Sequence, residues 1–376
     1  MRIFDQKNSM INSTMKKIIL LLVLSVFSMS ALAQVAFKDE RLTEEENARF
    51  SLALAYSDNG REDESIAILD ELIEKHPDVS FLKFEKAYCL SRRKQDYKSA
   101  YETLKPAMSA PDAVPEIFSA AAQCQEMMGK PKEALETYEA GIKRFPHSGS
   151  LYLETGDILI AQGHTKEGIK AYERGIKADP GNPSNYYRAV QYLIDDQPVK
   201  AIIYAELHNI ICNPVEPLGA KVSKMLYDAY NANIHFEADT VRTTFSRDRD
   251  IVTDINAVDR PDALLKDPST VAQEIDFDKA MKASIDVKAL KAAGGQLTLA
   301  ELSAIRRRFM KNYASGEKGE SAAKLFLLQS FVLHSGNWEA YNMYMMREGR
   351  PEEYSAWLQD NADALEALFK FLWTSE

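Results

Sequence analysis

Histidine and cysteine are the side chains that most often bind metals or act as nucleophiles, and the sequence contains six histidines and three cysteines. No two histidines have the i, i+4 spacing that places both on one face of a zinc-binding helix. The cysteines lack the close pairing of a zinc site, and an odd, sparse set does not make a disulfide framework. These residues are His76, His147, His164, His208, His235 and His334, and Cys89, Cys124 and Cys212. We therefore predict no metal site and no cofactor, and we expect the cysteines to be buried, reduced thiols.

One short motif carries the paired carboxylates that a phosphoryl-transfer site uses. Asp248-Arg249-Asp250-Ile251-Val252 superficially resembles the paired aspartates of haloacid-dehalogenase-type phosphotransferases. Such a site needs a buried apolar strand directly before it, whereas residues 242–247 are mostly polar. We therefore predict a surface turn at residues 248–252. The sequence also lacks a Gly-x-Ser-x-Gly elbow and a phosphate-binding glycine loop, so no catalytic residue is predicted.

The charge balance excludes one large class of partner. The 376 residues include 46 Lys and Arg and 56 Asp and Glu, which gives a net charge of −10. A chain with no surplus of cations is poorly suited to a phosphate backbone, so we expect no nucleic-acid partner. Hydrophobic residues make up 45% of the chain, and we expect a folded protein with a large core.

The amino-terminal residues have the order of a secretory signal peptide, since two lysines precede an apolar run that ends in small residues. The apolar run is too short to span a bilayer. We predict a signal peptide at residues 1–33, cleaved between Ala33 and Gln34, with an uncleaved membrane anchor as the alternative. Either Met1 or Met15 is the start. A periplasmic or secreted protein with no integral membrane segment after cleavage is expected.

Helix-ending prolines recur along the first half of the chain at spacings of 69, 34 and 34 residues. They are Pro77, Pro146, Pro180 and Pro214. Before each proline lie two helical patterns joined by a short polar turn. A small residue recurs where the first helix of each pair would cross the second, and it allows the two backbones to approach. Ala53, Ala87, Ala122 and Gly156 occupy this position in four successive copies.

One copy shows the pattern most completely. Tyr152-x-x-Thr155-Gly156-x-x-Leu159 forms one helix face, Gly163 the turn, and Gly168-x-x-x-Tyr172 the second face. This pattern resembles the tetratricopeptide repeat (TPR). The resemblance implies a mostly α-helical protein, an α-solenoid of about five helix-turn-helix pairs. The copies occupy residues 46–79, 80–114, 115–148, 149–182 and 183–216; the second copy lacks the final proline, and the fifth has Asp195-Asp196-Gln197-Pro198 in place of a glycine turn.

In arrays of this family the first helix of each pair lines the concave face. With each helix aligned on its small residue, the resemblance implies a groove of aromatic, aliphatic and polar side chains. These candidate binding residues are Phe50, Leu54, Phe84, Tyr88, Gln123, Asp157, Tyr187 and Gln191. Packing between repeats is the alternative role for the aromatic residues. Arg188 is the only base that matches the Lys/Asn/Arg clamp of chaperone adaptors, so we do not expect that function.

The pattern changes after the TPR array at residues 46–216. An amphipathic helix at 217–233 is expected to cap the array. Alternating residues then indicate a short β-hairpin, followed by a loop, in a linker-like segment at 234–296. Helical periodicity returns at 297–376, where we expect a small carboxyl-terminal domain of four helices, the last over residues 352–373. No family resemblance is found after residue 233.

These observations favour a non-enzymatic scaffold for protein–protein interaction in the bacterial cell envelope. Its partner would be another envelope or exported protein, bound as an extended peptide or a helix in the concave groove. The alternative is a TPR domain attached to an unrecognised catalytic domain at residues 234–376. The absence of catalytic motifs disfavours an enzyme, although a novel active site would not appear in a motif search.

Overall fold

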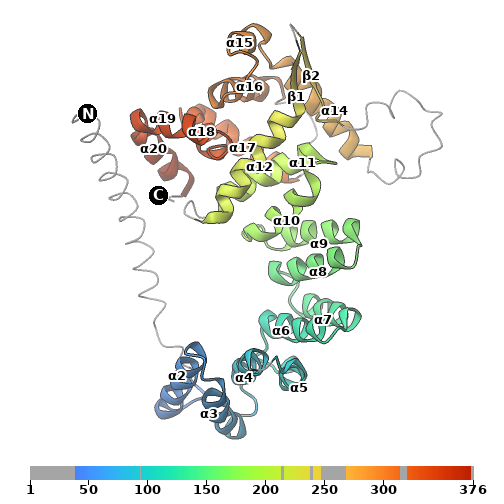
Figure 1. Ribbon diagram of the computed structural model, residues 1–376, viewed down its shortest axis with the longest axis vertical. Helices are drawn as coiled ribbons and strands as arrows, with labels where there is room; N and C mark the ends of the chain where they lie inside the picture. The colour runs from blue at the N-terminus through green and yellow to red at the C-terminus, as the bar shows by residue number, and fades with distance from the viewer. Residues whose placement is uncertain are drawn as a thin grey trace, which may run out of the picture. The chain divides into compact units, whose positions relative to one another are not determined.

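The computed structural model describes residues 39–93, 95–212, 216–237, 240–246, 268–313 and 320–373 (Figure 1). The predicted signal peptide at 1–33 and the predicted turn at 248–252 lie outside the described residues. The chain divides into two compact units between Ile158 and Leu159. They are called unit 1 and unit 2 below, and each is described by itself.

Unit 1 consists of helices in consecutive pairs, as the repeat pattern predicts. The pairs are α2 (Glu44–Asp58) with α3 (Glu62–Lys75), α4 (Ser80–Arg92) with α5 (Tyr97–Ala107), and α6 (Pro115–Met127) with α7 (Pro131–Arg144), and α8 (Gly149–Ala161) begins the next pair. Local signals set the helix starts. Thr43 and Glu46 form a capping box at α2, and a proline opens α6 and α7.

Small residues occupy the tightest contacts between these helices. Ala53, Ala87 and Ala122, at the predicted crossing position, are all buried. A second close approach, which we did not recognise in the sequence, lies on the second helix of a pair. A Cβ atom added to Gly141 would come within 2.9 Å of the Phe118 Cβ atom. Larger side chains at either position would force the helices apart.

The turn between the two helices of a pair contains a residue in the left-handed conformation. Gly60 and Gly129 have φ angles of 71° and 72°, which glycine adopts without a steric penalty from Cβ. The second pair has no glycine in its turn, and there Gln95 has a φ of 58°. The geometry of the repeat thus imposes the left-handed turn on a residue that disfavours it.

In its described residues, unit 2 contains further helical pairs, then a hairpin and seven more helices. Its elements are α9 (Thr165–Ala178), α10 (Pro183–Leu193), α11 (Pro198–Ile211), α12 (Pro217–Asn233), β1 (Ile234–Glu237), β2 (Thr240–Thr243), α14 (Pro268–Ala283), α15 (Val287–Ala292), α16 (Leu299–Asn312), α17 (Glu320–His334), α18 (Trp338–Met345), α19 (Pro351–Asp360) and α20 (Ala362–Trp373). The mostly α-helical solenoid with a short hairpin and carboxyl-terminal helices is confirmed. β1 and β2 are antiparallel, and Ile234 pairs with Thr243.

Two details after the array differ from the expectation. The linker-like segment at 234–296 contains two helices, α14 and α15, which its many Asp and Pro residues concealed. The single helix expected over 352–373 is broken into α19 and α20 at Asn361. The Asn361 side chain donates to the backbone carbonyl of Trp357, satisfying an acceptor at the end of α19 and favouring termination there.

A chain of aromatic rings forms much of the core of unit 2. The rings of Tyr230, Phe245, Phe277, Phe309 and Phe326 follow one another with centroid distances of 6.0, 5.3, 4.7 and 6.0 Å. These rings come from α12, the residues after β2, α14, α16 and α17. The hairpin and the carboxyl-terminal helices therefore share one core with α12.

Replacing Gln95 by Gly should stabilise the protein by about 0.5–1 kcal/mol, because glycine relieves the left-handed strain at a small cost in unfolded-state entropy. Thermal melts followed by circular dichroism would measure this. Gly129→Gln is the matched control and should destabilise by about 1 kcal/mol. A Cβ at Gly129 meets nothing within 4 Å, so only backbone conformation changes there. Shifts of the same sign in both variants would contradict this account.

Candidate interaction surface

The predicted binding residues of unit 1 lie on its first helices, α2, α4, α6 and α8. Tyr88 is 46% exposed and Gln123 is also exposed, whereas Leu54, Phe84 and Asp157 are half-buried. α4 lies against α6, so Tyr88 and Gln123 are on neighbouring helices. These five side chains are partly or fully accessible to a partner.

Phe50 differs from the other predicted binding residues. It is only 2% exposed, and its ring packs edge-on against Phe81 with a centroid distance of 4.9 Å. Its role is therefore packing between the first two repeats, the alternative given for the aromatic residues. We leave Phe50 out of the interaction surface.

The two remaining predicted residues belong to unit 2. Tyr187 is half-buried, and its ring lies 6.5 Å from that of His208. Gln191 is exposed and accepts a hydrogen bond of 3.3 Å from the guanidinium of Arg188, one turn earlier. Burial lowers the pKa of His208, so its imidazole is held neutral beside Tyr187.

An arginine holds the exposed Tyr88 ring in place. The Arg92 guanidinium lies 5.5 Å from the ring centroid and donates a hydrogen bond of 3.3 Å to the Tyr88 hydroxyl. Arg92 in turn lies 3.6 Å from a carboxylate oxygen of Glu62 on α3. An exposed aromatic side chain with restricted rotamers loses less entropy when a partner covers it.

Carboxylates that the sequence reasoning missed lie beside the predicted residues. Gln123 donates to Glu154 at 3.5 Å, and the buried Tyr138 hydroxyl donates to Glu126 at 2.7 Å. Burial raises the pKa of Tyr138 strongly, and the charges of Glu126, Glu154 and Asp157 add to the shift. Glu126 of α6 and Glu154 and Asp157 of α8 therefore lie near the Tyr138 hydroxyl. Their charges make the electrostatic potential at α6 and α8 negative.

A similar arrangement occurs at the start of unit 1. Burial raises the pKa of Glu85 on α4, and the charge of Asp58 at the end of α2 adds to this shift. Glu85 and Glu154 both lie two residues before the small residue of their repeat. Our alignment used only the positions three before and one after the small residue, so it overlooked both carboxylates. We call Leu54, Phe84, Tyr88, Gln123, Asp157 and the carboxylates Asp58, Glu85, Glu126 and Glu154 the first-helix surface.

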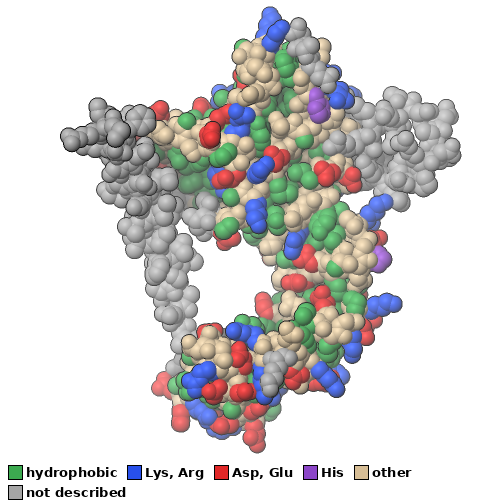
Figure 2. Space-filling model, viewed as in Figure 1, with side chains coloured by type: hydrophobic (Ala, Val, Ile, Leu, Met, Phe, Trp, Pro, Cys, Tyr) green, Lys and Arg blue, Asp and Glu red, His purple; other side chains and the backbone are tan. Residues whose placement is uncertain are grey.

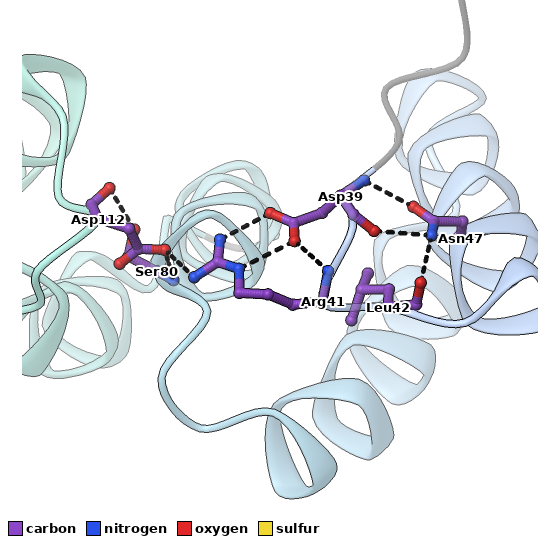
Figure 3. Close-up of polar contacts among 6 residues, drawn as sticks. All are labelled: Asp39, Arg41, Leu42, Asn47, Ser80 and Asp112. Atoms are coloured by element: carbon purple, nitrogen blue, oxygen red, sulfur yellow. Dashed lines mark hydrogen bonds and ion pairs between the residues drawn. The ribbon is translucent and has the colours of Figure 1, made fainter.

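The segment before α2 fixes the relative position of the repeats that carry the first-helix surface (Figure 3). Arg41 forms ion pairs with Asp39 at 2.6 Å and with Asp112, in the loop before α6, at 2.7 Å. The backbone N–H of Ser80, at the start of α4, donates to the same Asp112 carboxylate oxygen at 3.0 Å. Residues 39–41 thereby connect the beginnings of three successive repeats.

The pKa values of these carboxylates agree with that geometry. The hydrogen bond from Arg41 lowers the pKa of Asp39. Burial alone would raise the pKa of Asp112, but hydrogen bonds from Ser80 and the ion pair with Arg41 outweigh it, and the pKa is lowered. Both carboxylates are therefore charged at neutral pH, and they support the cluster there.

Unit 2 contains a buried cluster of charged and polar side chains around Glu206 of α11. Glu206 is 1% exposed and Arg306 of α16 is 2% exposed. The Arg306 guanidinium donates to both Glu206 carboxylate oxygens, at 2.6 and 2.5 Å. Gln329 of α17 and the Tyr341 hydroxyl of α18 donate to the same carboxylate at 2.6 and 2.7 Å. We call these four residues the Glu206 network.

The surroundings of Arg306 indicate a structural rather than a catalytic role. Its guanidinium also donates to the Asn342 side chain at 2.5 Å and lies 5.5–5.8 Å from the ring centroids of Tyr230, Trp338 and Tyr341. A carboxylate and a guanidinium that are both buried and saturated with hydrogen bonds offer no group to a substrate. Among the described residues, no three His, Cys, Asp or Glu side chains lie close enough to hold a metal ion.

The comparisons with known proteins identify the repeats. Residues 47–78 and 127–183 match tetratricopeptide repeat models. The chain therefore contains tetratricopeptide repeats, and repeats of this kind form extended surfaces that bind other proteins. No curated protein matches the sequence. Within the described part of the chain, none of the helices is long and apolar enough to cross a membrane.

Several solved structures are similar to the chain at low sequence identity. Pseudomonas aeruginosa PilF is 14% identical, with 50% of this chain and 84% of that chain covered and a TM-score of 0.41. PilW, described as a type IV pilus biogenesis factor, is 17% identical, with 51% and 92% covered and a TM-score of 0.38. The carboxyl-terminal part of a TPR protein from Cytophaga hutchinsonii is 14% identical, with 80% and 95% covered and a TM-score of 0.39.

Replacing Glu206 by Ala should destabilise unit 2 by about 3–5 kcal/mol, because Arg306 would remain buried without its counter-ion. The double variant Glu206→Leu/Arg306→Met removes both charges and should recover more than half of that loss. Denaturant unfolding measures both variants, and hydrogen exchange of α16 to α18 locates the effect. If the double variant were less stable than Glu206→Ala, the network would not be a coupled unit.

Proposed function

We propose that the first-helix surface binds an extended segment or a helix of another protein. The observation that carries this proposal is the exposed Tyr88 ring, held by Arg92 on a first helix of the array. Rigid, exposed aromatic side chains are the residue type that contributes most to protein interfaces. Half-buried Phe84 and Leu54 extend the apolar part of this surface.

The charge of the first-helix surface defines the partner's chemistry. Asp58, Glu85, Glu126, Glu154 and Asp157 make it acidic. A partner segment that combines apolar side chains with Lys or Arg would complement it, whereas an acidic segment would be repelled. In this proposal the apolar anchors supply most of the affinity, and the charges set the association rate and its dependence on salt.

The proposed place of action is the bacterial cell envelope or the exterior, and the partner is another envelope or exported protein. This part rests on the signal-peptide pattern of residues 1–33. The proposed function is non-enzymatic. The Glu206 network of unit 2 is already saturated with internal hydrogen bonds, which supports a structural role for Arg306, Gln329 and Tyr341.

A photocrosslinking amino acid in place of Tyr88 should give a discrete covalent adduct in the native cells. The same amino acid at Glu139, exposed on the second helix α7, is the control and should not. Tyr88→Ala should then weaken binding of the purified partner by about 1–3 kcal/mol without changing the melting temperature. Equal adducts at both positions, or unchanged affinity, would exclude the first-helix surface as the binding site.

Export is tested separately from binding. The protein recovered from the periplasm or the medium should have an intact mass that corresponds to a chain beginning at Gln34. The replacement Ala33→Arg should block processing, because signal peptidase requires a small residue at that position. Recovery of the unprocessed wild-type chain in the membrane fraction would show that residues 1–33 act as an anchor.

A further inference from the structure

The surface formed by the end of α14, by α15 and by α16 has a charge opposite to that of the whole chain. Residues 279–311 contain eight Lys or Arg and two Asp or Glu, a net charge of +6 within a chain of net charge −10, although one of the eight, Arg306, is buried and paired with Glu206. We call its solvent-exposed cations the basic patch. They are Lys279, Lys282, Lys288, Lys291, Arg307 and Lys311. Figure 2 shows Lys and Arg side chains over α15.

Most cations of the basic patch form no ion pair with the described residues, whereas three cations of unit 1 are paired. In unit 1, Arg49, Lys86 and Arg93 form ion pairs with Glu71, Asp70 and Asp63 of α3. In the part of the chain that the structure describes, the exposed cations of α14 and α16 and Lys288 of α15 form no ion pair. Cations gathered without counter-ions repel one another, and an anionic partner would relieve this repulsion.

An exposed apolar pair lies on the helix next to the basic patch. Leu327 and Phe331, one turn apart on α17, are 59% and 58% exposed. α17 packs against α16 through Phe326, whose ring lies 6.0 Å from that of Phe309. The opposite side of α17 contributes Leu325, Gln329 and Val332 to the core of unit 2, so the helix carries large apolar side chains on its buried side and also on its exposed side, beside the exposed Lys324 and His334. Large apolar side chains exposed next to one another mark a surface that another phase or molecule covers.

We infer that the basic patch and the apolar pair dock unit 2 on an anionic lipid surface. Four of the six cations of the basic patch lie on α14 and α15, and five of the six are lysines. A lysine ammonium acts as a point charge, whereas an arginine guanidinium binds a single carboxylate with two parallel hydrogen bonds. Diffuse lysine clusters attract anionic headgroups, and each cation near the surface strengthens binding about fivefold. Leu327 and Phe331 enter the boundary between headgroups and acyl chains.

A lipid surface fits these observations better than an acidic protein segment. An acidic segment would neutralise the cations but would not require two large, strongly exposed apolar side chains on the adjacent helix. A membrane surface offers negative charge and an apolar phase side by side. This inference does not depend on the first-helix surface, which belongs to unit 1.

Vesicle flotation with the purified protein tests the inference, with the same amino terminus in every variant. The protein should float with vesicles of phosphatidylcholine mixed with phosphatidylglycerol, should not float with phosphatidylcholine alone, and should be released by salt. The variant Lys282→Glu/Lys288→Glu/Lys311→Glu should bind the mixed vesicles at least about tenfold more weakly. No flotation of the wild-type protein, or equal flotation with both vesicles, overturns the inference.

The control Lys130→Glu/Lys132→Glu/Lys143→Glu changes the net charge equally through exposed lysines of unit 1 and should bind within about twofold of wild type. Equal losses in the two triple variants would show a general charge effect and overturn the inference. Leu327→Asp/Phe331→Asp, with an unchanged circular-dichroism spectrum, should also weaken binding. Full binding by that variant would overturn the role of the apolar pair and favour an acidic protein as the occupant of the basic patch.

Discussion

The carboxylate of Glu206 is the group on which the arrangement of unit 2 depends. It is buried in α11, the second helix of the fifth repeat, and it accepts hydrogen bonds from side chains of α16, α17 and α18. A buried charge without these partners would be strongly unfavourable. The last repeat and the helices that follow it must therefore fold together, and the saturated carboxylate specifies one arrangement of these helices among the many that apolar contacts alone would allow.

The repeats of unit 1 depend on a different constraint, the distance between neighbouring backbones. Alanine at the crossing position and Gly141 on α7 allow the two helices of a pair to pack closely. The left-handed turn residue reverses the chain direction, so the second helix of each pair runs back beside the first. The first helices therefore present their side chains at a regular spacing. The Arg41 cluster adds a polar connection between three of these repeats to the apolar packing between neighbouring repeats, such as that of Phe50 on Phe81.

Periodic features were predictable from the sequence, and features without a period were not. The small residues and prolines recur every 34 or so residues, so the helical pairs could be recognised. Alternating residues indicated the hairpin, and an amphipathic pattern indicated the helix α12. Glu206 and Arg306 are 100 residues apart, and no repeated spacing connects them. Phe50 was placed in the groove because the alignment gave its position along the helix but not the neighbour, Phe81, that covers it. Glu85 and Glu154 recur with the repeat, so a wider set of aligned positions would have found them.

The cluster around Arg41 also bears on where the first repeat begins. By its repeated pattern that repeat starts at residue 46, yet Arg41, which is paired with Asp39, contacts Asp112 in the loop before α6. The Asn47 side chain also donates to the backbone carbonyls of Asp39, Leu42 and Thr43. A fragment cut at residue 46 would lose these contacts and leave Asp112 without its arginine. The folding module therefore includes at least seven residues that no repeat motif contains, and proteolytic trimming up to α2 would loosen three repeats at once.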